Sequence, residues 1–222
     1  MSKKGEGVRK FFKKFWFLLW KDNSAKGWIF SLIFLFIFIK FIFFPGLSLI
    51  TGTALPLAIV ESCSMHHEGT VFSVYDNWWE QHDNKYEALG ISKEDFEGGF
   101  LSKFRRGFTK GDIIFLIGAK PENLQIGNII AFNSGTRGVP VIHRIINIEE
   151  KDGELIFTTI GDNNAQSLNP ANNVLGVDER EIKAEQIVGK AAFRIVPYLG
   201  WGKLIFFEHL RTESEKGICQ EN

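Results

Sequence analysis

The chain has 222 residues, which is enough for one medium-sized domain or two small ones. Its 26 lysines and arginines balance its 26 aspartates and glutamates, so the overall charge gives no sign of a nucleic-acid partner. The two cysteines, Cys63 and Cys219, are far apart and lack metal-ligand spacing, which argues against both a disulfide framework and a zinc site. We therefore expect Cys63 to be a small packed residue, and we expect no metal and no cofactor.

Basic and aromatic residues fill the N-terminal segment. Residues 8–20 alternate bases with aromatic rings at helical spacing, so this segment can lie as a helix in the headgroup region of a bilayer. The next run, 28–44, is almost wholly apolar and, continued to Ile50, approaches the ~20 residues that span a bilayer. A cleaved signal peptide would have a shorter apolar run and a shorter basic stretch before it, so the pattern favours an uncleaved anchor.

The bases precede the apolar run, which predicts a cytoplasmic N-terminus and places everything after Phe44 on the outer side of the membrane. The predicted division is a basic and aromatic segment that is cytoplasmic or interfacial (1–26), a transmembrane anchor (27–50), an extracytoplasmic domain (51–210) and a charged tail (211–222).

Short β-prone runs separated by turn residues follow the anchor. The runs do not alternate with helices as βαβ units would, so we expect a mainly β domain of short, mostly antiparallel strands. The expected strands are 56–62, 113–117, 126–132, 139–148, 155–160 and 186–196.

An insert, residues 70–107, interrupts this series of strands. It is rich in charges and tryptophan, and a short helix at about 93–100, capped by Ser92, is expected within it. We interpret the insert as a partly helical surface element. Trp78 and Trp79 either pack it onto the domain or contact a membrane interface or a partner.

Three polar residues stand at strand ends or interrupt a strand. The apolar run 55–60 ends in small polar residues that include Ser64, the form expected of a strand that delivers a serine to the rim of a sheet. His143 interrupts a later strand, and Asp162 follows another within the sequence GDNN. A histidine can take the proton of a serine hydroxyl, and a carboxylate can orient that histidine. The plainer alternatives are an ordinary strand end, an ordinary strand histidine and an Asx turn.

The ordered motifs of the chain resemble those of type I signal peptidases, in their archaeal and endoplasmic-reticulum branch. One motif alone is weak evidence, but six in the order of the family, after an N-terminal anchor, are strong evidence. The resemblance runs from about Ala58 to Lys203 and implies a signal-peptidase-like β domain. Its blocks are VESCSM (60–65), GDIIFL (111–116), IGNIIAF (126–132), VPVIHRII (139–146), TTIGDNN (158–164) and IVGKAAFRIVPYLGW (187–201).

The resemblance implies a role for each matched residue. Ser64 matches the nucleophilic serine, His143 the general base, and Asp162 the acid that orients the histidine. Ser62 matches the polar residue whose hydroxyl, together with the backbone N–H of Ser64, would hold the oxyanion. The implied protein is a membrane-anchored serine endopeptidase that removes signal peptides from secretory preproteins after small residues.

The same resemblance implies partners and a location. The partners would be signal-peptide-bearing preproteins, the lipid bilayer and the translocation machinery, with no nucleic acid among them. The location would be the cell membrane, with the catalytic domain on the outer face, or the endoplasmic-reticulum membrane if the organism is eukaryotic.

The chain departs from the family pattern in four places. Cys63 replaces a glycine between the two serines, and His66 and His67 follow where a proline is usual. Adjacent histidines on a strand point to opposite sides, which argues against a shared metal ion. The insert 70–107 is also long for this branch.

The fourth departure concerns a second acid. The family often carries another aspartate shortly after the one in GDNN, and this chain has Ser167 and Leu168 there. Asp178 and Glu179, in a longer loop, are the candidates to replace it. Without a replacement, Asp162 acts alone or the enzyme is impaired.

Two other functions fit the same residues. The chain could be a catalytically silent, membrane-anchored β module that binds extended peptides or a translocation partner. It could also be a peptidase of the same chemistry with another substrate, such as one processed surface protein.

Overall fold

The computed structural model describes residues 3–67, 75–93, 107–134, 140–171, 176–210 and 216–219. The chain divides into two compact units, Met1–Ile50 and Thr51–Asn222. The short helix expected at about 93–100 lies, beyond Lys93, outside the described residues.

The first unit is helical. Helix α1 (Lys3–Trp20) precedes a continuous helical stretch composed of α2 (Ala25–Phe38), the π-helical turn η1 (Ile39–Phe43) and α3 (Phe44–Thr51). Ser24 caps α2, because its Oγ accepts a hydrogen bond of 3.2 Å from the backbone N–H of Gly27.

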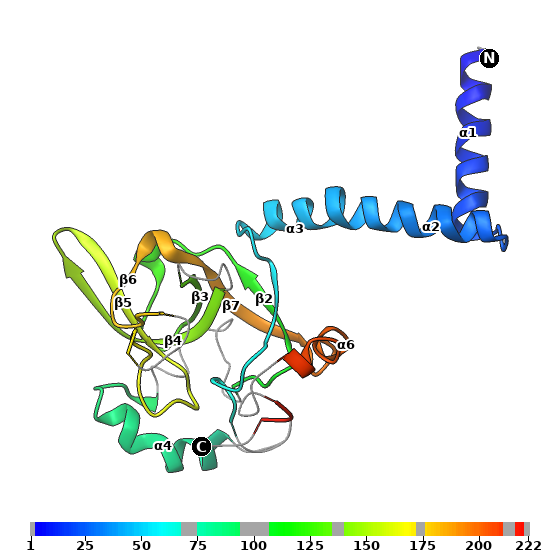
Figure 1. Ribbon diagram of the computed structural model, residues 1–222. Coiled ribbons are helices and arrows are strands. Elements are labelled where there is room, and N and C mark those ends of the chain that lie inside the picture. Colours follow the sequence, from blue (N-terminus) through cyan, green and yellow to red (C-terminus); the bar gives the residue numbers. More distant parts are fainter. Residues whose placement is uncertain are drawn as a thin grey trace. The chain divides into compact units, whose positions relative to one another are not determined.

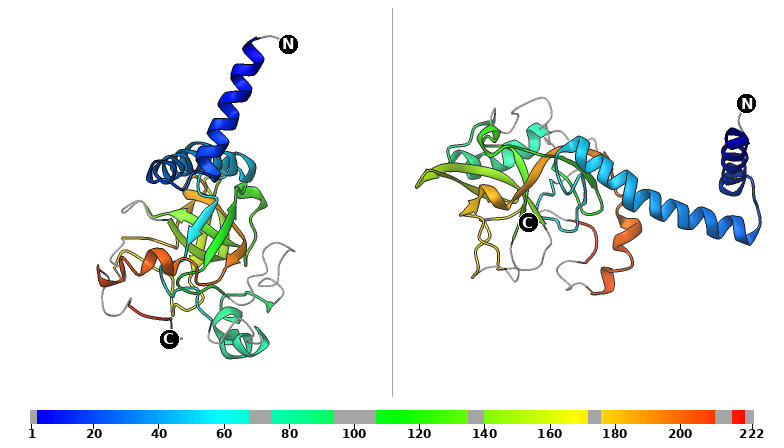
Figure 2. Two further views of the ribbon diagram at one scale, coloured as in Figure 1. Left: turned by 90° about the vertical axis from the view of Figure 1, so that its right-hand side faces the viewer. Right: turned by 90° about the horizontal axis from the view of Figure 1, so that it is seen from above.

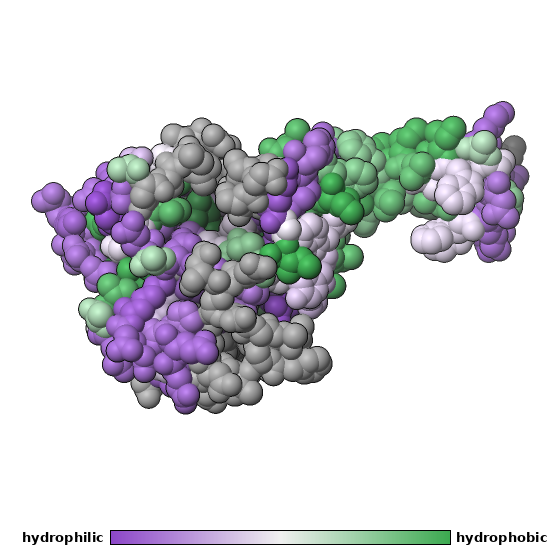
Figure 3. Space-filling model, turned by 60° about the horizontal axis from the view of Figure 1, so that its bottom comes forward, coloured by the Kyte–Doolittle hydropathy of each residue, from purple (hydrophilic) through white to green (hydrophobic). Residues whose placement is uncertain are grey.

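The helix Ala25–Thr51 is long and apolar enough to cross a membrane. Its large apolar side chains are mostly exposed, and Figure 3 shows them gathered along the helix. The π turn comes just before Pro45, whose ring removes a backbone donor and disfavours regular α-helical bonding at this point. The apolar N-terminal helix expected from the sequence is therefore present.

Seven antiparallel strands form one sheet within the described part of the second unit, and Figure 1 shows their arrangement. The hairpin of β4 and β5, yellow-green to yellow, projects beyond the other strands in the right-hand view of Figure 2. The predicted mainly β, antiparallel domain is confirmed, and only β6 has no counterpart among the predicted strands. In spatial order the strands are β1 (Leu57–Ile59), β2 (Ile113–Ile117), β7 (Ile187–Val196), β3 (Ile129–Asn133), β4 (Pro140–Lys151), β5 (Glu154–Ile160) and β6 (Ile182–Lys183).

Helical elements are short in the second unit, apart from α4 (Tyr75–Glu87) in the insert. The insert is thus partly helical, as predicted. The others are η2 (Pro121–Asn123), η3 (Ala184–Gln186), α6 (Trp201–Leu204) and η4 (Glu208–Leu210).

Helix α4 is packed onto the sheet by its own apolar cluster. Trp79 is buried and stacks on Tyr86 with 5.9 Å between ring centroids, so it packs the insert onto the domain. The side chain of Trp78 lies outside the described residues. The cluster is completed by Ile91 and by residues of β4 and β5, namely Ile146 and Ile160.

The turn before β2 explains why the sequence has Gly-Asp there. The Asp112 carboxylate is buried and accepts hydrogen bonds from the N–H of Thr109 (3.0 Å) and from Arg194 (3.0 Å). Gly111 has φ +92°, and a Cβ on it would lie 2.2 Å from Cδ1 of Trp201. Only glycine fits this position, because any side chain would both strain the backbone and collide with the indole.

We predict that Gly111→Ala lowers the free energy of unfolding by about 2–4 kcal/mol, since it combines backbone strain with overpacking. Gly153→Ala is the matched control: its φ is +81° but nothing lies within 4 Å of the new methyl group, so only the backbone strain remains. Urea unfolding of the full chain in detergent measures both. Equal losses in the two variants would contradict the packing argument.

Candidate active site

Ser64 and His143 lie together. Ser64 is in the turn that follows β1, and its Oγ is 2.7 Å from Nε2 of His143, a buried residue of β4. The Oγ of Ser62, two residues before, is 3.1 Å from that of Ser64. Ser62 is exposed and Ser64 is half-buried, so a substrate can approach the hydroxyl from solvent. This is the spacing that proton transfer from serine to histidine requires.

The other ring nitrogen of His143 contacts a glutamate. Nδ1 bonds to Oε1 of Glu179, whose side chain is completely buried. The same carboxylate accepts hydrogen bonds from the Thr159 hydroxyl (2.8 Å) and from the Leu168 N–H (2.7 Å). Serine, histidine and glutamate therefore form one continuous hydrogen-bonded chain of the kind that activates a serine hydroxyl.

Asp162 does not occupy the position that we predicted. Its two oxygens accept hydrogen bonds from Nε (2.9 Å) and an Nη (2.6 Å) of Arg144, the residue after His143. Successive residues of a strand point to opposite faces, so Asp162 lies on the Arg144 face of β4 and Glu179 on the His143 face. Glu179, rather than Asp162, is thus the carboxylate beside the histidine.

The surroundings of Asp162 form a closed, buried network. Besides Arg144, the carboxylate accepts hydrogen bonds from Nε2 of His67 (2.9 Å) and from the hydroxyl of Tyr86 in α4 (3.3 Å). Burial alone would raise the pKa of Asp162, but the charge and hydrogen bonds of Arg144 outweigh it and hold the pKa well below its usual range. Asp162 is therefore a carboxylate anion that fixes an arginine.

Glu179 lies beside the position at which the family pattern leads us to expect a second aspartate. Asp178, the alternative, forms an ion pair with Arg180 at the surface. The backbone of Leu168, at the position expected for the second aspartate, bonds to the Glu179 carboxylate. The longer loop thus places the carboxylate of Glu179 next to Leu168 and His143. In the sequence, only the two adjacent acids at the end of this loop, Asp178 and Glu179, indicated such a residue, and the sequence did not distinguish between them.

The turn Gly161–Asn164, which contains Asp162, holds the backbone of the turn 62–65. We call the turn 62–65 the nucleophile turn, because Ser64 is the predicted nucleophile. Asn163 donates from its N–H to the carbonyl of Ser64 (2.8 Å) and from Nδ2 to the carbonyl of Cys63 (3.2 Å). A Cβ on Gly161 would lie 2.6 Å from the Ser64 carbonyl oxygen, so the close approach depends on glycine.

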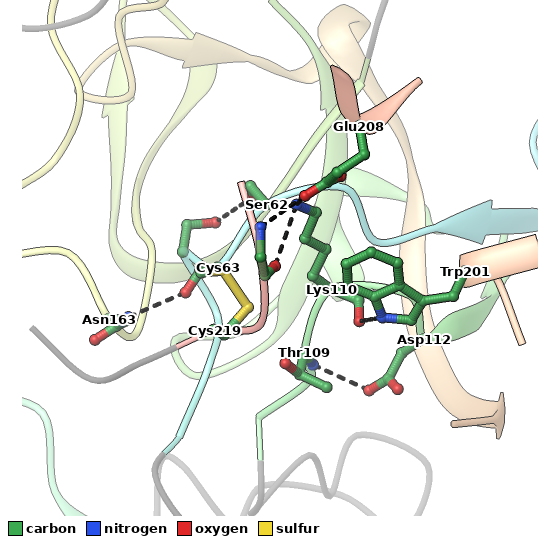
Figure 4. Close-up of a disulfide and its surroundings, with 11 residues drawn as sticks. Ser62, Cys63, Thr109, Lys110, Asp112, Asn163, Trp201, Glu208 and Cys219 are labelled. Atoms are coloured by element: carbon green, nitrogen blue, oxygen red, sulfur yellow. Dashed lines mark hydrogen bonds and ion pairs between the residues drawn. A yellow bond between two sulfur atoms is a disulfide. The ribbon is translucent and has the colours of Figure 1, made fainter. Parts of the chain in front are cut away.

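Cys63 forms a disulfide with Cys219, which corrects the expectation that the two cysteines are unpaired. The sequence separation of 156 residues gave no local sign of it. Figure 4 shows the disulfide beside Ser62, with Asn163 to one side and Lys110 and Glu208 to the other.

An ion pair holds the segment that carries Cys219. Lys110 is buried and donates to Glu208 Oε1 (2.6 Å), and the same oxygen accepts the N–H of Gly217 (2.7 Å). The nucleophile turn is thus bound covalently to a segment that is itself anchored to the domain.

His66 and His67 do not form a metal site with other residues in the described ranges, which contain no cluster of three or more histidine, cysteine, aspartate or glutamate ligands. His67 is instead buried against Asp162.

The disulfide should brace the fold. We predict that the double substitution Cys63→Ser and Cys219→Ser lowers the free energy of unfolding by about 2–5 kcal/mol. Urea unfolding of the full chain with and without reductant measures the change. The reductant should destabilise the wild type and leave the double variant unaffected. Two free thiols in the oxidised wild type, found by mass spectrometry, would contradict the pairing.

The buried histidine should make stability depend on pH. Burial lowers the pKa of His67, although the Asp162 carboxylate opposes the shift. The unfolded chain therefore binds a proton near pH 6.5 that the folded chain does not, and stability should fall as pH drops below that value. Between pH 6.5 and 5.5 the wild type should lose up to ~1 kcal/mol more than His67→Gln. Parallel stability curves for the two proteins would refute this assignment.

Known proteins similar in sequence to this chain test the predicted resemblance to type I signal peptidases. No family model matches the chain. The chain is 29% identical over 103 residues to "Signal peptidase complex catalytic subunit SEC11C" of Canis lupus familiaris, covering 46% of this chain and 52% of that protein. It is 28% identical over 109 residues to the human "Putative signal peptidase complex catalytic subunit SEC11B", covering 49% and 63% respectively. It is 29% identical over 99 residues to the SEC11 subunit of Lachancea thermotolerans, covering 42% and 55%.

The chain spans about half the length of the SEC11C relatives that it matches. The resemblance predicted from the motifs is confirmed: the chain has homologues among the SEC11 catalytic subunits, which represent the endoplasmic-reticulum type of type I signal peptidase.

Proposed function

We propose that this chain is a membrane-anchored serine endopeptidase that removes signal peptides from secretory preproteins after small residues. The observation that carries the proposal is the hydrogen-bonded chain from Ser64 through His143 to Glu179. The names of the relatives support the reaction, because they are catalytic subunits of signal peptidase complexes.

In this mechanism Ser64 attacks the carbonyl carbon of the scissile peptide bond while His143 takes its proton. The Glu179 carboxylate holds the imidazole in the required tautomer and stabilises its positive charge. The tetrahedral intermediate collapses as His143 gives the proton to the leaving amine. A water molecule, deprotonated by His143, then hydrolyses the ester on Ser64 and frees the enzyme.

The oxyanion of the intermediate needs donors beside Ser64. We assign this role to the backbone N–H of Ser64 and to the hydroxyl of Ser62. The 3.1 Å between the two serine oxygens supports the assignment, because it places the Ser62 hydroxyl beside the reacting atom.

The substrate would bind as an extended strand. In the strand order β1 stands at one edge of the sheet, and it leads directly into the nucleophile turn. A peptide that adds to this edge gains backbone hydrogen bonds and brings its scissile bond to Ser64. Shallow apolar pockets would then admit only small side chains next to the bond that is cut.

The membrane keeps enzyme and substrate together. The helix Ala25–Thr51 would span the bilayer, with the basic N-terminal segment 1–26 on the cytoplasmic side or at its interface. The domain from residue 51 onward would then lie on the outer face of the cell membrane, or in the lumen of the endoplasmic reticulum in a eukaryote. The Cys63–Cys219 disulfide supports this orientation, because disulfides persist in oxidising compartments. The partners would be preproteins, lipid, the translocation machinery and further subunits.

We predict that the purified full chain, in detergent or lipid, cleaves a preprotein after a small residue. Ser64→Ala and His143→Ala should each lower kcat by about 10⁴-fold or more. Glu179→Gln should lower kcat by about 10²–10⁴-fold, because it removes the charge beside the imidazole. It should cost about 1–3 kcal/mol of stability, since its amide N–H₂ cannot accept the hydrogen bonds that the carboxylate receives.

Asp162→Asn is the matched control for Glu179→Gln, since it makes the same chemical change in the other buried carboxylate. It should mainly lower stability, by leaving the Arg144 charge buried with a neutral partner. Cleavage rates and unfolding curves for both variants separate the two roles. If the wild type binds preproteins without cutting them, the chain is the silent binding module instead. If Glu179→Gln keeps full activity, the glutamate is not part of the mechanism.

A further inference from the structure

The C-terminal end of α4 reaches the turn Gly161–Asn164. The Lys85 ammonium donates to the carbonyl oxygens of Asn164 (2.5 Å) and Asp162 (3.1 Å), and lies 3.5 Å from that of Gly161. An ammonium group has three N–H donors, and here all three have a backbone carbonyl of the same turn within reach. The lysine therefore acts as a cation that holds three carbonyl oxygens of one turn together.

That turn is in direct contact with the nucleophile. Asn163 stands between two of the carbonyls that Lys85 binds, and it donates hydrogen bonds to the backbone carbonyls of Cys63 and Ser64. The Asp162 carbonyl and the Asn163 N–H belong to the same planar peptide group, so a rotation of that carbonyl also rotates the N–H that bonds to Ser64. Only one residue thus separates the ammonium group from the Ser64 backbone.

The C-terminal end of α4, which carries Lys85, is fixed against the domain. The next residue, Tyr86, is completely buried, stacks on Trp79 and donates its hydroxyl to the Asp162 carboxylate. The Lys85 ammonium also lies 5.1 Å from the centre of the Tyr86 ring, a distance at which a cation is attracted to an aromatic face. Helix α4 is therefore held at the turn by a side chain next to the lysine, and its end cannot move without moving the turn.

We propose that Lys85 is a positioning residue for Ser64: its ammonium group holds the carbonyls of Gly161–Asn164 so that Asn163 keeps the nucleophile turn in register with His143. The insert is then part of the active site rather than a side element. The effect on catalysis rests on the function proposed above, whereas the effect on the nucleophile turn does not.

The first experiment measures the turn without using activity. Hydrogen exchange, followed by mass spectrometry on the full chain in detergent, compares wild type with Lys85→Met, which keeps an apolar stem of similar length. We expect Lys85→Met to lose protection in peptides that cover residues 62–67 and 161–164, and to keep it in β3 and β7. Unchanged exchange in both turns would overturn the proposal, and so would uniform loss over the whole domain, which would indicate general destabilisation.

Two control variants test whether the effect is specific to Lys85: one changes a neighbouring residue of α4, and the other removes a lysine elsewhere on the surface. Asn84→Ala changes the neighbouring exposed residue of α4, and Lys151→Ala removes an exposed lysine at the end of β4. Both should exchange and cleave like the wild type. If either reproduces the loss seen for Lys85→Met, the effect does not belong to the Lys85 ammonium.

The second experiment restores the missing cation. Lys85→Ala should lower kcat about 10- to 100-fold with little change in KM, because the substrate edge of the sheet is untouched while the nucleophile is misplaced. Propylammonium or butylammonium ions should restore part of the lost rate in Lys85→Ala and have no effect on the wild type or Asn84→Ala. Absence of rescue, or a loss that is wholly in KM, would overturn the positioning role. A wild type without any cleavage would refute the proposed function, and the exchange experiment would then decide the inference alone.

Discussion

The buried ion pair between Asp162 and Arg144 links the two halves of the candidate active site. Arg144 belongs to the strand that carries His143, and Asp162 belongs to the turn that holds the backbone of Ser64. A charge pair without solvent gains little net free energy, since both groups lose their hydration, but removal of one partner leaves a bare charge and costs about 3–5 kcal/mol. The pair therefore acts as a constraint on geometry more than as a source of stability.

The strand β4 carries two different tasks on its two faces. His143 points toward Ser64 and Glu179, while Arg144 points toward Asp162, His67 and the end of α4. Each face has its own buried carboxylate, so the group assigned to the proposed chemistry, Glu179, is separate from the one that pairs with the arginine, Asp162. His143 and Arg144 thus share the backbone of β4 but are paired with different buried carboxylates.

Much of the domain could be predicted from local patterns. The runs of apolar residues after Gly-Asp and Gly-Asn turns mark strands, and the abrupt end of the first apolar run marks the nucleophile turn. Ser64 and His143 could be named as candidates because each stands in a block that resembles a family motif. Glu179 could not, because a loop of irregular structure joins GDNN to it, and the path of such a loop depends on tertiary contacts that have no periodic signature. Asp162 was given the wrong partner because a motif fixes the residue type but not the face of the strand that it meets.

The contribution of α4 was also beyond sequence reasoning. Lys85 is one of several charged residues on a polar helix, and nothing in its spacing separates it from a solvated surface lysine. Its significance comes from contact with three carbonyls of a turn that follows 76–79 residues later, a relation that only the folded chain displays.

The covalent link between Cys63 and Cys219 has a consequence for biosynthesis. Synthesis proceeds from the N-terminus, so the sulfur of Cys63 leaves the ribosome long before its partner, 156 residues later, has been translated. During that interval the nucleophile turn lacks its covalent brace and must rely on hydrogen bonds alone. The disulfide can close only once the segment anchored by Glu208 has arrived, so its oxidation is a late maturation event that a pulse-labelled chain would display as a delayed change in electrophoretic mobility.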